Sequence, residues 1–281
     1  MKLDIIINKH LLIWHILYQS SVSMEVHKLK QKLWMDNKKE YTLVHKDKEI
    51  ILRELDDFIP DDDTIYNMVE TSLIFKKIKK ETSQYRYTIL QIWDENRKKY
   101  MKHLNNILKY DTRDNYKICV VHPSLDVIET DFNTNIITIG KKISMRDKDN
   151  FLTYLMYKII KNDLNNIKTN ERDIVDAVVE LALTNELYTR VTEESKYSLG
   201  KKKLRALKEK IYPYWLMYLG VKQEDMQKYM IRDNIFFNLN NYEYDKHLEY
   251  IDLVSFINYI IKNKRKVAKI RTVQIENIEV L

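Results

Sequence analysis

Hydrophobic residues recur along the chain mainly at helical spacing, with a few short runs at strand spacing. The apolar positions predict helices over 23–35, 64–80, 84–110, 147–162, 172–191, 204–219 and 248–261. Short apolar runs predict strands at 3–7, 116–121 and 135–140, and 125–133 fits an antiparallel neighbour of the last one. We therefore expect an α+β protein that is mainly helical, with a small, mostly antiparallel sheet packed against its helices.

The change from helical to strand spacing at Asn115 indicates how the chain is divided. We expect an N-terminal helical region over 1–114 and a core over 115–281 that includes the C-terminal helices. One continuous domain is the alternative, because 281 residues are enough to bury a single large core.

Composition removes several classes of function. With three Gly and three Pro, the chain contains neither of the glycine-rich phosphate loops used by dinucleotide-binding and P-loop proteins. Cys119 is the only cysteine, and the N-terminus has no secretory signal pattern, so we expect a reducing, cytoplasmic location. No apolar run approaches roughly 18 residues, which argues against a membrane span.

The helix predicted over 147–162 carries the most informative spacing. Tyr157 and Lys161 are four residues apart on one face, as are the two His of the zinc-binding motif H-E-x-x-H. Eighteen residues separate Lys161 from Glu180, which lies on the next predicted helix. The spacing of these positions is thus that of a metallopeptidase helix, but the zinc-binding His residues and the Glu of the motif are absent from the helix.

In this succession of elements, residues 115–220 resemble the zincin-like metallopeptidases, in particular the gluzincin arrangement. The resemblance implies that Tyr157 stands for the first His, Lys158 for the catalytic Glu and Lys161 for the second His, while Glu180 matches the third ligand. A neutral tyrosine and protonated lysines are poor zinc ligands. We therefore expect a pseudo-active site without metal or cofactor, in which Lys158 or Lys161 pairs with Glu180. An unrelated mixed helical fold is the alternative.

The resemblance implies a function without catalysis. We expect a pseudo-metallopeptidase that binds or regulates a peptide or protein partner in the groove between the sheet edge and the 147–162 helix. Active zincins receive substrate there as an added strand, and such pairing needs only backbone groups. The oligomeric state does not follow from the sequence.

Glu186 falls in the apolar arc of the 172–191 helix, where a carboxylate is costly unless it is paired. Arg190, one turn later, is the nearest local partner, so we expect a buried structural ion pair. The alternative is an enzyme with a metal-free or relocated site, in which Glu186 and His122 would act as acid and base.

A second alternative comes from the net charge of +7. Nucleic acid would be held by exposed tyrosines and by two basic clusters, which contain Lys201, Lys202 and Lys203, and Lys264, Arg265 and Lys266. Both clusters flank predicted helices. Favourable interactions of cations with helix ends, or plain solvation of the lysines, explain the two clusters as well as phosphate binding does.

Overall fold

The fold is that of a computed structural model, which describes residues 1–18, 24, 27–28, 73–131, 136–143, 147–194, 200–238, 242–270 and 272–273. The chain forms two compact units. Unit 1 comprises Met1–Asn96 and Arg113–Lys148, and unit 2 comprises Arg97–Thr112 and Asp149–Leu281. The predicted helix over 23–35 lies mostly outside the described residues.

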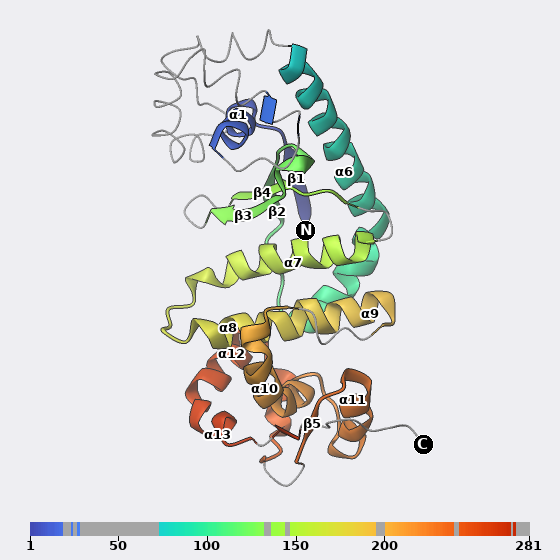
Figure 1. Cartoon of the computed structure of the whole chain (residues 1–281). Helices are drawn as coiled ribbons and strands as arrows, with labels where there is room; N and C mark the ends of the chain where they lie inside the picture. Colours follow the sequence, from blue (N-terminus) through green and yellow to red (C-terminus); the bar gives the residue numbers. More distant parts are fainter. Residues whose placement is uncertain are drawn as a thin grey trace, which may run out of the picture. The chain divides into compact units, whose positions relative to one another are not determined.

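The long helix α6 (Leu73–Leu108, teal in Figure 1) contributes residues to both units. The sequence predicts two helices with a break between 80 and 84, and within the described range this break is wrong. Thr82 and Ser83 lie within the helix, and their hydroxyls donate to the carbonyls of Ile78 and Lys79, one turn earlier, at 2.8 and 2.9 Å. These bonds satisfy the two hydroxyl groups without ending the helix.

Unit 1 contains a four-stranded sheet in the order β1-β2-β4-β3. Its strands are β1 (Lys2–Ile6), β2 (Asn115–Val120), β3 (Val127–Asp131) and β4 (Ile136–Gly140). The predicted antiparallel pairing of the 125–133 segment with β4 is confirmed. Since β1 pairs with β2, residues from both sides of the expected boundary at 114 share one sheet.

The sheet is mixed, so the expectation of a mostly antiparallel sheet is wrong. β1 pairs with β2 in parallel, and β2 pairs with β4 in parallel. Parallel neighbours need a long crossover. Helix α6 lies between β1 and β2 in the chain, and β3 intervenes between β2 and β4.

One face of the sheet packs against α1 (Lys9–Tyr18) and the start of α6. Asn8 begins α1, because its Oδ1 accepts from Leu11 N at 2.8 Å. The shared core consists of buried apolar side chains from α1, α6, the strands and the turn η1 (Pro123–Leu125): Leu11, Leu12, Ile13, Ile16, Phe75, Ile78, Cys119, Val121, Leu125, Val127 and Ile136.

Unit 2 is built around helices that follow the sheet in the chain. The elements are α7 (Lys148–Asp163), η3 (Leu164–Asn166), α8 (Arg172–Val179), η4 (Glu180–Leu187), α9 (Tyr188–Thr192), η5 (Lys202–Leu204), α10 (Arg205–Tyr218), η6 (Gln223–Asp225), α11 (Met226–Asp233), η7 (Lys246–Tyr250), α12 (Leu253–Lys262) and α13 (Lys264–Ala268), with the strand pair β5 (Phe236–Phe237) and β6 (Thr272–Val273). A mainly helical α+β fold is thereby confirmed.

Aromatic side chains form much of the core of unit 2. Trp215 and Tyr218 of α10 stack with ring centroids 5.1 Å apart, and Phe256 of α12 lies 4.8 Å from the Tyr218 ring. All three side chains are almost completely buried. None of the helices in the described ranges has the length and apolar character to span a membrane.

Candidate functional site

Helix α7 carries three of the four residues singled out as a pseudo-active site. Its apolar stripe is buried, which places Tyr157 inside and leaves Lys161 at the margin, 28% exposed. Lys161 Nζ lies 2.7 Å from Asp176 Oδ1 of α8, so its partner is Asp176 and not Glu180. Lys158 lies with its Nζ 5.3 Å from the centroid of the Tyr154 ring.

The helix that carries Glu180 changes its winding there. The elements α8, η4 and α9 follow one another without interruption (Figure 1), and η4 is a π-helix of eight residues that begins at Glu180. Thr184 Oγ1 donates to Glu180 O at 2.8 Å within this wider turn. Because π-turns alter the direction of successive side chains, the sequence-based assumption of regular α spacing does not hold over 180–187.

Glu180 is 1% exposed and is held from two directions. Its two carboxylate oxygens accept from the backbone N of Lys201 at 3.1 and 3.2 Å. Its Oε2 also lies 3.3 Å from the Nζ of Lys208, a buried lysine of α10. Burial lowers the pKa of Lys208, and the neighbouring Glu180 opposes that shift.

Asp176 of α8 lies beside the Glu180–Lys208 pair and contacts two lysines that are partly exposed. Its Oδ1 contacts Lys161, and its Oδ2 lies 2.7 Å from Lys201 Nζ. Burial alone would raise the pKa of Asp176, but the hydrogen bonds from the two lysines outweigh it, and the pKa is lowered. Lys201 therefore contacts both carboxylates, Glu180 through its backbone and Asp176 through its side chain.

Sequence reasoning missed Asp176 and Lys208, and it assigned Lys201 only to a basic cluster. Two signals were available. Asp176 and Glu180 are like charges four residues apart, an unfavourable arrangement unless cations lie between them. Lys208 shares the apolar stripe of Leu204, Ile211 and Trp215, which marks a lysine that needs a buried partner.

The residues present do not fit a catalytic zinc ion. Burial raises the pKa of the Tyr157 phenol, which keeps it protonated and therefore a poor anionic ligand. Lys161 is hydrogen-bonded as an ammonium group, and both oxygens of Glu180 are occupied. Among the described residues, no group of three or more His, Cys, Asp and Glu side chains is arranged to hold a metal ion.

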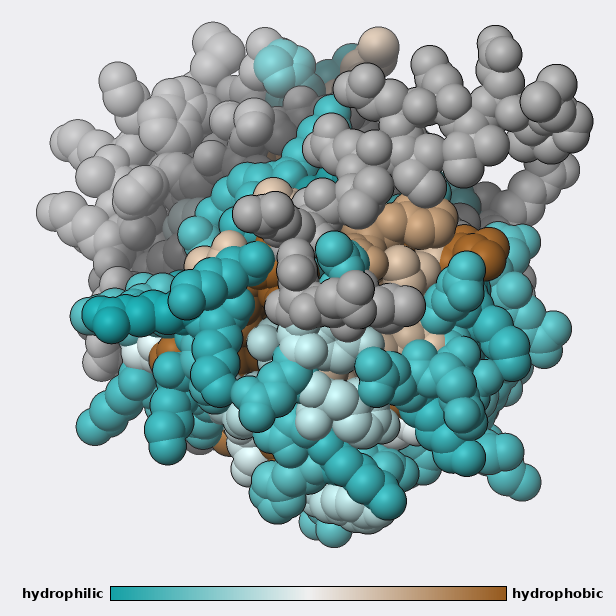
Figure 2. Space-filling model, turned by 90° about the horizontal axis from the view of Figure 1, so that it is seen from below, coloured by the Kyte–Doolittle hydropathy of each residue, from teal (hydrophilic) through white to brown (hydrophobic). Residues whose placement is uncertain are grey.

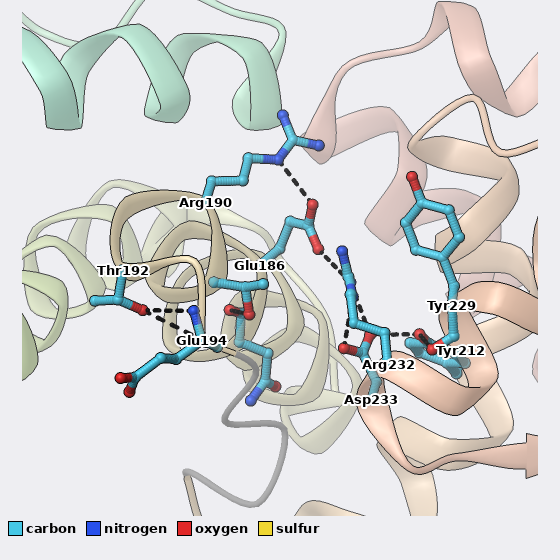
Figure 3. Close-up of polar contacts among 10 residues, drawn as sticks. Glu186, Arg190, Thr192, Glu194, Tyr212, Tyr229, Arg232 and Asp233 are labelled. Atoms are coloured by element: carbon cyan, nitrogen blue, oxygen red, sulfur yellow. Dashed lines mark hydrogen bonds and ion pairs between the residues drawn. The ribbon is translucent and has the colours of Figure 1, made fainter.

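Glu186, inside the π-helix, lies at the centre of a second buried network (Figure 3). Its Oε1 accepts from Arg190 Nε at 2.7 Å, which is the contact expected from the spacing. Its Oε2 accepts from Arg232 Nη2 of α11 at 2.9 Å. Glu186 is 3% exposed, so two guanidinium groups compensate one buried carboxylate.

Arg232 extends this network to α10. Its Nε and Nη2 donate to the two oxygens of Asp233, each at 2.8 Å, and Asp233 Oδ2 accepts a short hydrogen bond from Tyr212. The Tyr212 hydroxyl also contacts Tyr229 O at 3.2 Å. These contacts join η4, α9, α10 and α11 (Figure 3), which is a structural role.

His122, the proposed partner of Glu186 in an enzyme, is engaged within unit 1. Its Nε2 lies 2.9 Å from Glu81 Oε2, and its Nδ1 accepts from Ser124 N at 3.2 Å, which caps η1. Since Glu186 is bound by two arginines, both members of the expected acid and base pair have other partners.

Most members of the two basic clusters contact carboxylates. Lys203 Nζ lies 3.0 Å from Asp173, Lys264 Nζ lies 2.5 Å from Glu171, and Lys266 Nζ lies 3.3 Å from Glu243. Lys201 contacts Asp176. The two remaining members, Lys202 and Arg265, are exposed, and no acidic side chain among the described residues contacts them. These pairs reduce the positive potential available to phosphate groups.

The face drawn in Figure 2 shows few large apolar areas among the described residues. In the view of Figure 2, hydrophilic residues cover most of the described surface, and hydrophobic colour is confined to smaller areas between them. Exposed large side chains such as Tyr87, Ile231 and Tyr250 are far apart in the sequence. A partner approaching this face would therefore meet mainly charged and polar groups.

No protein-family model, curated protein sequence or solved structure matches the chain.

Proposed function

We propose that the chain is a non-catalytic, zincin-like protein that binds an extended peptide by adding it as a strand to the outer edge of β3. The order of elements supports the resemblance: β2, the edge strand β3, β4, α7 and the helix bearing Glu180 follow one another in the chain. The chemistry around Glu180 supports a function without zinc, because amines occupy the carboxylates. The single observation that carries the peptide-binding proposal is the hydrogen-bonding register of β3.

The register identifies which backbone groups of β3 point outward. Val121 N donates to Ile139 O, so the backbone groups of Ile139 point towards β2. Ile128 lies opposite Ile139 in the antiparallel pair, and its N–H and C=O therefore point away from β4. The same alternation turns those of Thr130 outward, while Glu129 bonds inward. Two residues thus supply a template for strand addition.

The opposite edge of the sheet is blocked. Lys2 N donates to Asp114 O of the chain leading into β2, so alternation turns the backbone of Ile5 outward from β1. Arg86 of α6 donates from its Nε to Ile5 O at 2.5 Å. A side chain therefore covers this edge, which is a common protection against unwanted pairing. Within the described residues, β3 pairs with β4 alone.

The proposal is tested by removing one outward donor without altering the ladder. Thr130→Pro eliminates the outward N–H, and proline is tolerated on an edge strand when its nitrogen faces solvent. Peptides selected by the full-length protein from a phage-displayed random library are measured by calorimetry against both proteins. We expect wild type to bind and Thr130→Pro to lose binding at least roughly tenfold, as expected for losing a backbone hydrogen bond and the fit around it.

The matched control is Thr130→Val, which keeps the backbone N–H. The Thr130 hydroxyl is buried and has no hydrogen-bond partner among the described residues, so its loss leaves no partner unsatisfied. We expect Thr130→Val to bind like wild type, and both variants to melt within about 3 °C of it. Failure to select any peptide, or equal affinity of Thr130→Pro and wild type, would overturn the proposal.

A reducing cytoplasm is part of this proposal. Cys119 lies on β2 and is fully buried, and burial raises the pKa of its thiol to about 12. Such a thiol is packed as a small apolar side chain and is unreactive at neutral pH.

A further inference from the structure

Four basic side chains gather in unit 2, three of them on α6 and the fourth, Arg190, at the margin of the Glu186 network. Lys99, Lys102 and His103 lie on one face of α6, at positions i, i+3 and i+4. Arg190 of α9 joins them. Figure 3 shows the Arg190 side chain extending towards the mint-green ribbon of α6. Burial lowers the pKa of His103, and the charges of Arg190, Lys102 and Lys99 lower it further. We call these four residues the Arg190 cluster.

Two carboxylates lie close to the Arg190 cluster, and each of them has a further partner outside it. Glu186 contacts Arg190, but Arg232 also occupies that carboxylate. Glu95, one turn before Lys99, accepts a hydrogen bond from Gln91. Lys99 and Lys102 are exposed and have no acidic contact in the described part of the chain. Lys109, whose pKa is influenced by the charge of Arg190, donates hydrogen bonds from its Nζ to the backbone carbonyls of Tyr218 and Glu249.

Arg190 retains binding capacity towards the outside. One nitrogen, Nε, donates to Glu186, and the side chain is 28% exposed. Figure 3 shows its two terminal nitrogens extending beyond the ion pair, away from Glu186. A guanidinium oriented in this way can receive a carboxylate with both donors, and the buried Glu186 holds it in place.

We propose that the Arg190 cluster binds an acidic protein segment, through carboxylates that contact Arg190, Lys99 and Lys102. A carboxylate source is favoured over nucleic acid because the tyrosines beside the cluster, Tyr100 and Tyr188, are buried and present no ring for base stacking. The cluster is also short, confined to one turn of α6 and one side chain of α9. This inference does not depend on strand addition at β3.

The test uses the full chain and a glutamate homopeptide as probe. The double variant Lys99→Glu/Lys102→Glu reverses two charges of the cluster. The matched control, Lys222→Glu/Lys228→Glu, makes the same change in net charge at two exposed lysines elsewhere in unit 2. We expect the first variant to bind the probe roughly tenfold more weakly at physiological salt, and the control to change affinity less than about twofold.

A second readout reports the location of binding. The His103 imidazole resonance is followed by NMR through a pH titration with and without the probe, and is assigned with His103→Gln. Bound carboxylates should raise the pKa of His103, because they offset the neighbouring cations. Equal losses in the two double variants, an unperturbed His103, or tighter binding of an oligothymidylate of equal charge would each overturn the inference.

Discussion

Gly200 and Glu180 fit together so closely that a side chain at position 200 would overlap the carboxylate. A Cβ built on Gly200 would collide with Glu180 Oε2, and the backbone there has a φ of +110°. The next residue, Lys201, donates its backbone N–H to the same carboxylate. A glycine is therefore needed to bring the Lys201 backbone onto Glu180, and the contact closes the site in unit 2.

Replacing this glycine should be costly. Gly200→Ala combines an unfavourable φ with displacement of a buried carboxylate, and we expect it to lower the free energy of unfolding by roughly 2–4 kcal/mol. Urea denaturation measures the loss. Gly220→Ala is the control, because Gly220 also has a positive φ, +77°, but its added Cβ would lie 3.1 Å from Glu249 Oε1, a tight contact that a small shift of the glutamate relieves, whereas the Cβ added at Gly200 would collide with Glu180 Oε2. If Gly220→Ala is the more damaging change, the Gly200–Glu180 relationship is wrong.

The buried Lys208–Glu180 pair should show strong coupling. Lys208→Met leaves Glu180 with the backbone N–H of Lys201 as its donor, and Glu180→Gln removes the carboxylate nearest to the buried Lys208 ammonium. Each change should therefore destabilise by roughly 2–4 kcal/mol. The double variant should recover part of that loss. A double-mutant cycle from urea denaturation tests this, with Arg205→Met/Glu209→Gln as an exposed control pair on α10. Additive effects of the buried pair would contradict the assignment.

Asp176 should make the protein more sensitive to acid. Because its pKa is lowered in the folded state, it contributes stability above the unfolded pKa of about 3.9, and this contribution is lost as the pH falls through the lower folded value. Asp176→Asn should be less stable than wild type at neutral pH, and the difference should shrink below about pH 4. Thermal unfolding between neutral and acid pH measures it. A difference that does not depend on pH would refute this explanation.

Arg232 should matter more to stability than Arg190. Arg232 contacts the carboxylates of both Glu186 and Asp233, whereas Arg190 contacts the Glu186 carboxylate alone among the described acidic side chains. Arg232→Ala therefore leaves two buried acids undercompensated, with an expected loss of roughly 3 kcal/mol, against about 1 kcal/mol for Arg190→Ala. Chemical denaturation of the two single variants compares them directly. Similar losses would show that Asp233 does not depend on Arg232.

Added zinc should leave the protein unchanged. The lysines on Asp176 and Glu180 compete with a divalent cation, so we expect less than one bound zinc ion per chain after dialysis and no shift of the melting temperature with a chelator. Elemental analysis and calorimetry provide the measurements. Zinc bound at one ion per chain, and lost in Glu180→Gln, would show that the carboxylate serves a metal after all.

Local patterns in the sequence determined the elements and the contacts between near neighbours. Short apolar runs marked β2 and β4, the apolar stripe marked α7, and four-residue spacing put Glu186 beside Arg190. These elements and this contact follow from the periodicity of helices and strands, which can be read within a single segment of the sequence.

The tertiary structure alone decided the parallel pairing of β1, β2 and β4 and the partners of Glu180. Lys201 and Lys208 lie 21 and 28 positions after Glu180 in the numbering, on elements whose packing no local pattern encodes. The π-helix shifts the side chains of 180–187 away from the regular spacing that the sequence suggested. Asp176, one turn before Glu180, contacts Lys161, the lysine that was expected to reach Glu180. The pairing of charges depends on distances between elements rather than on spacing within one element.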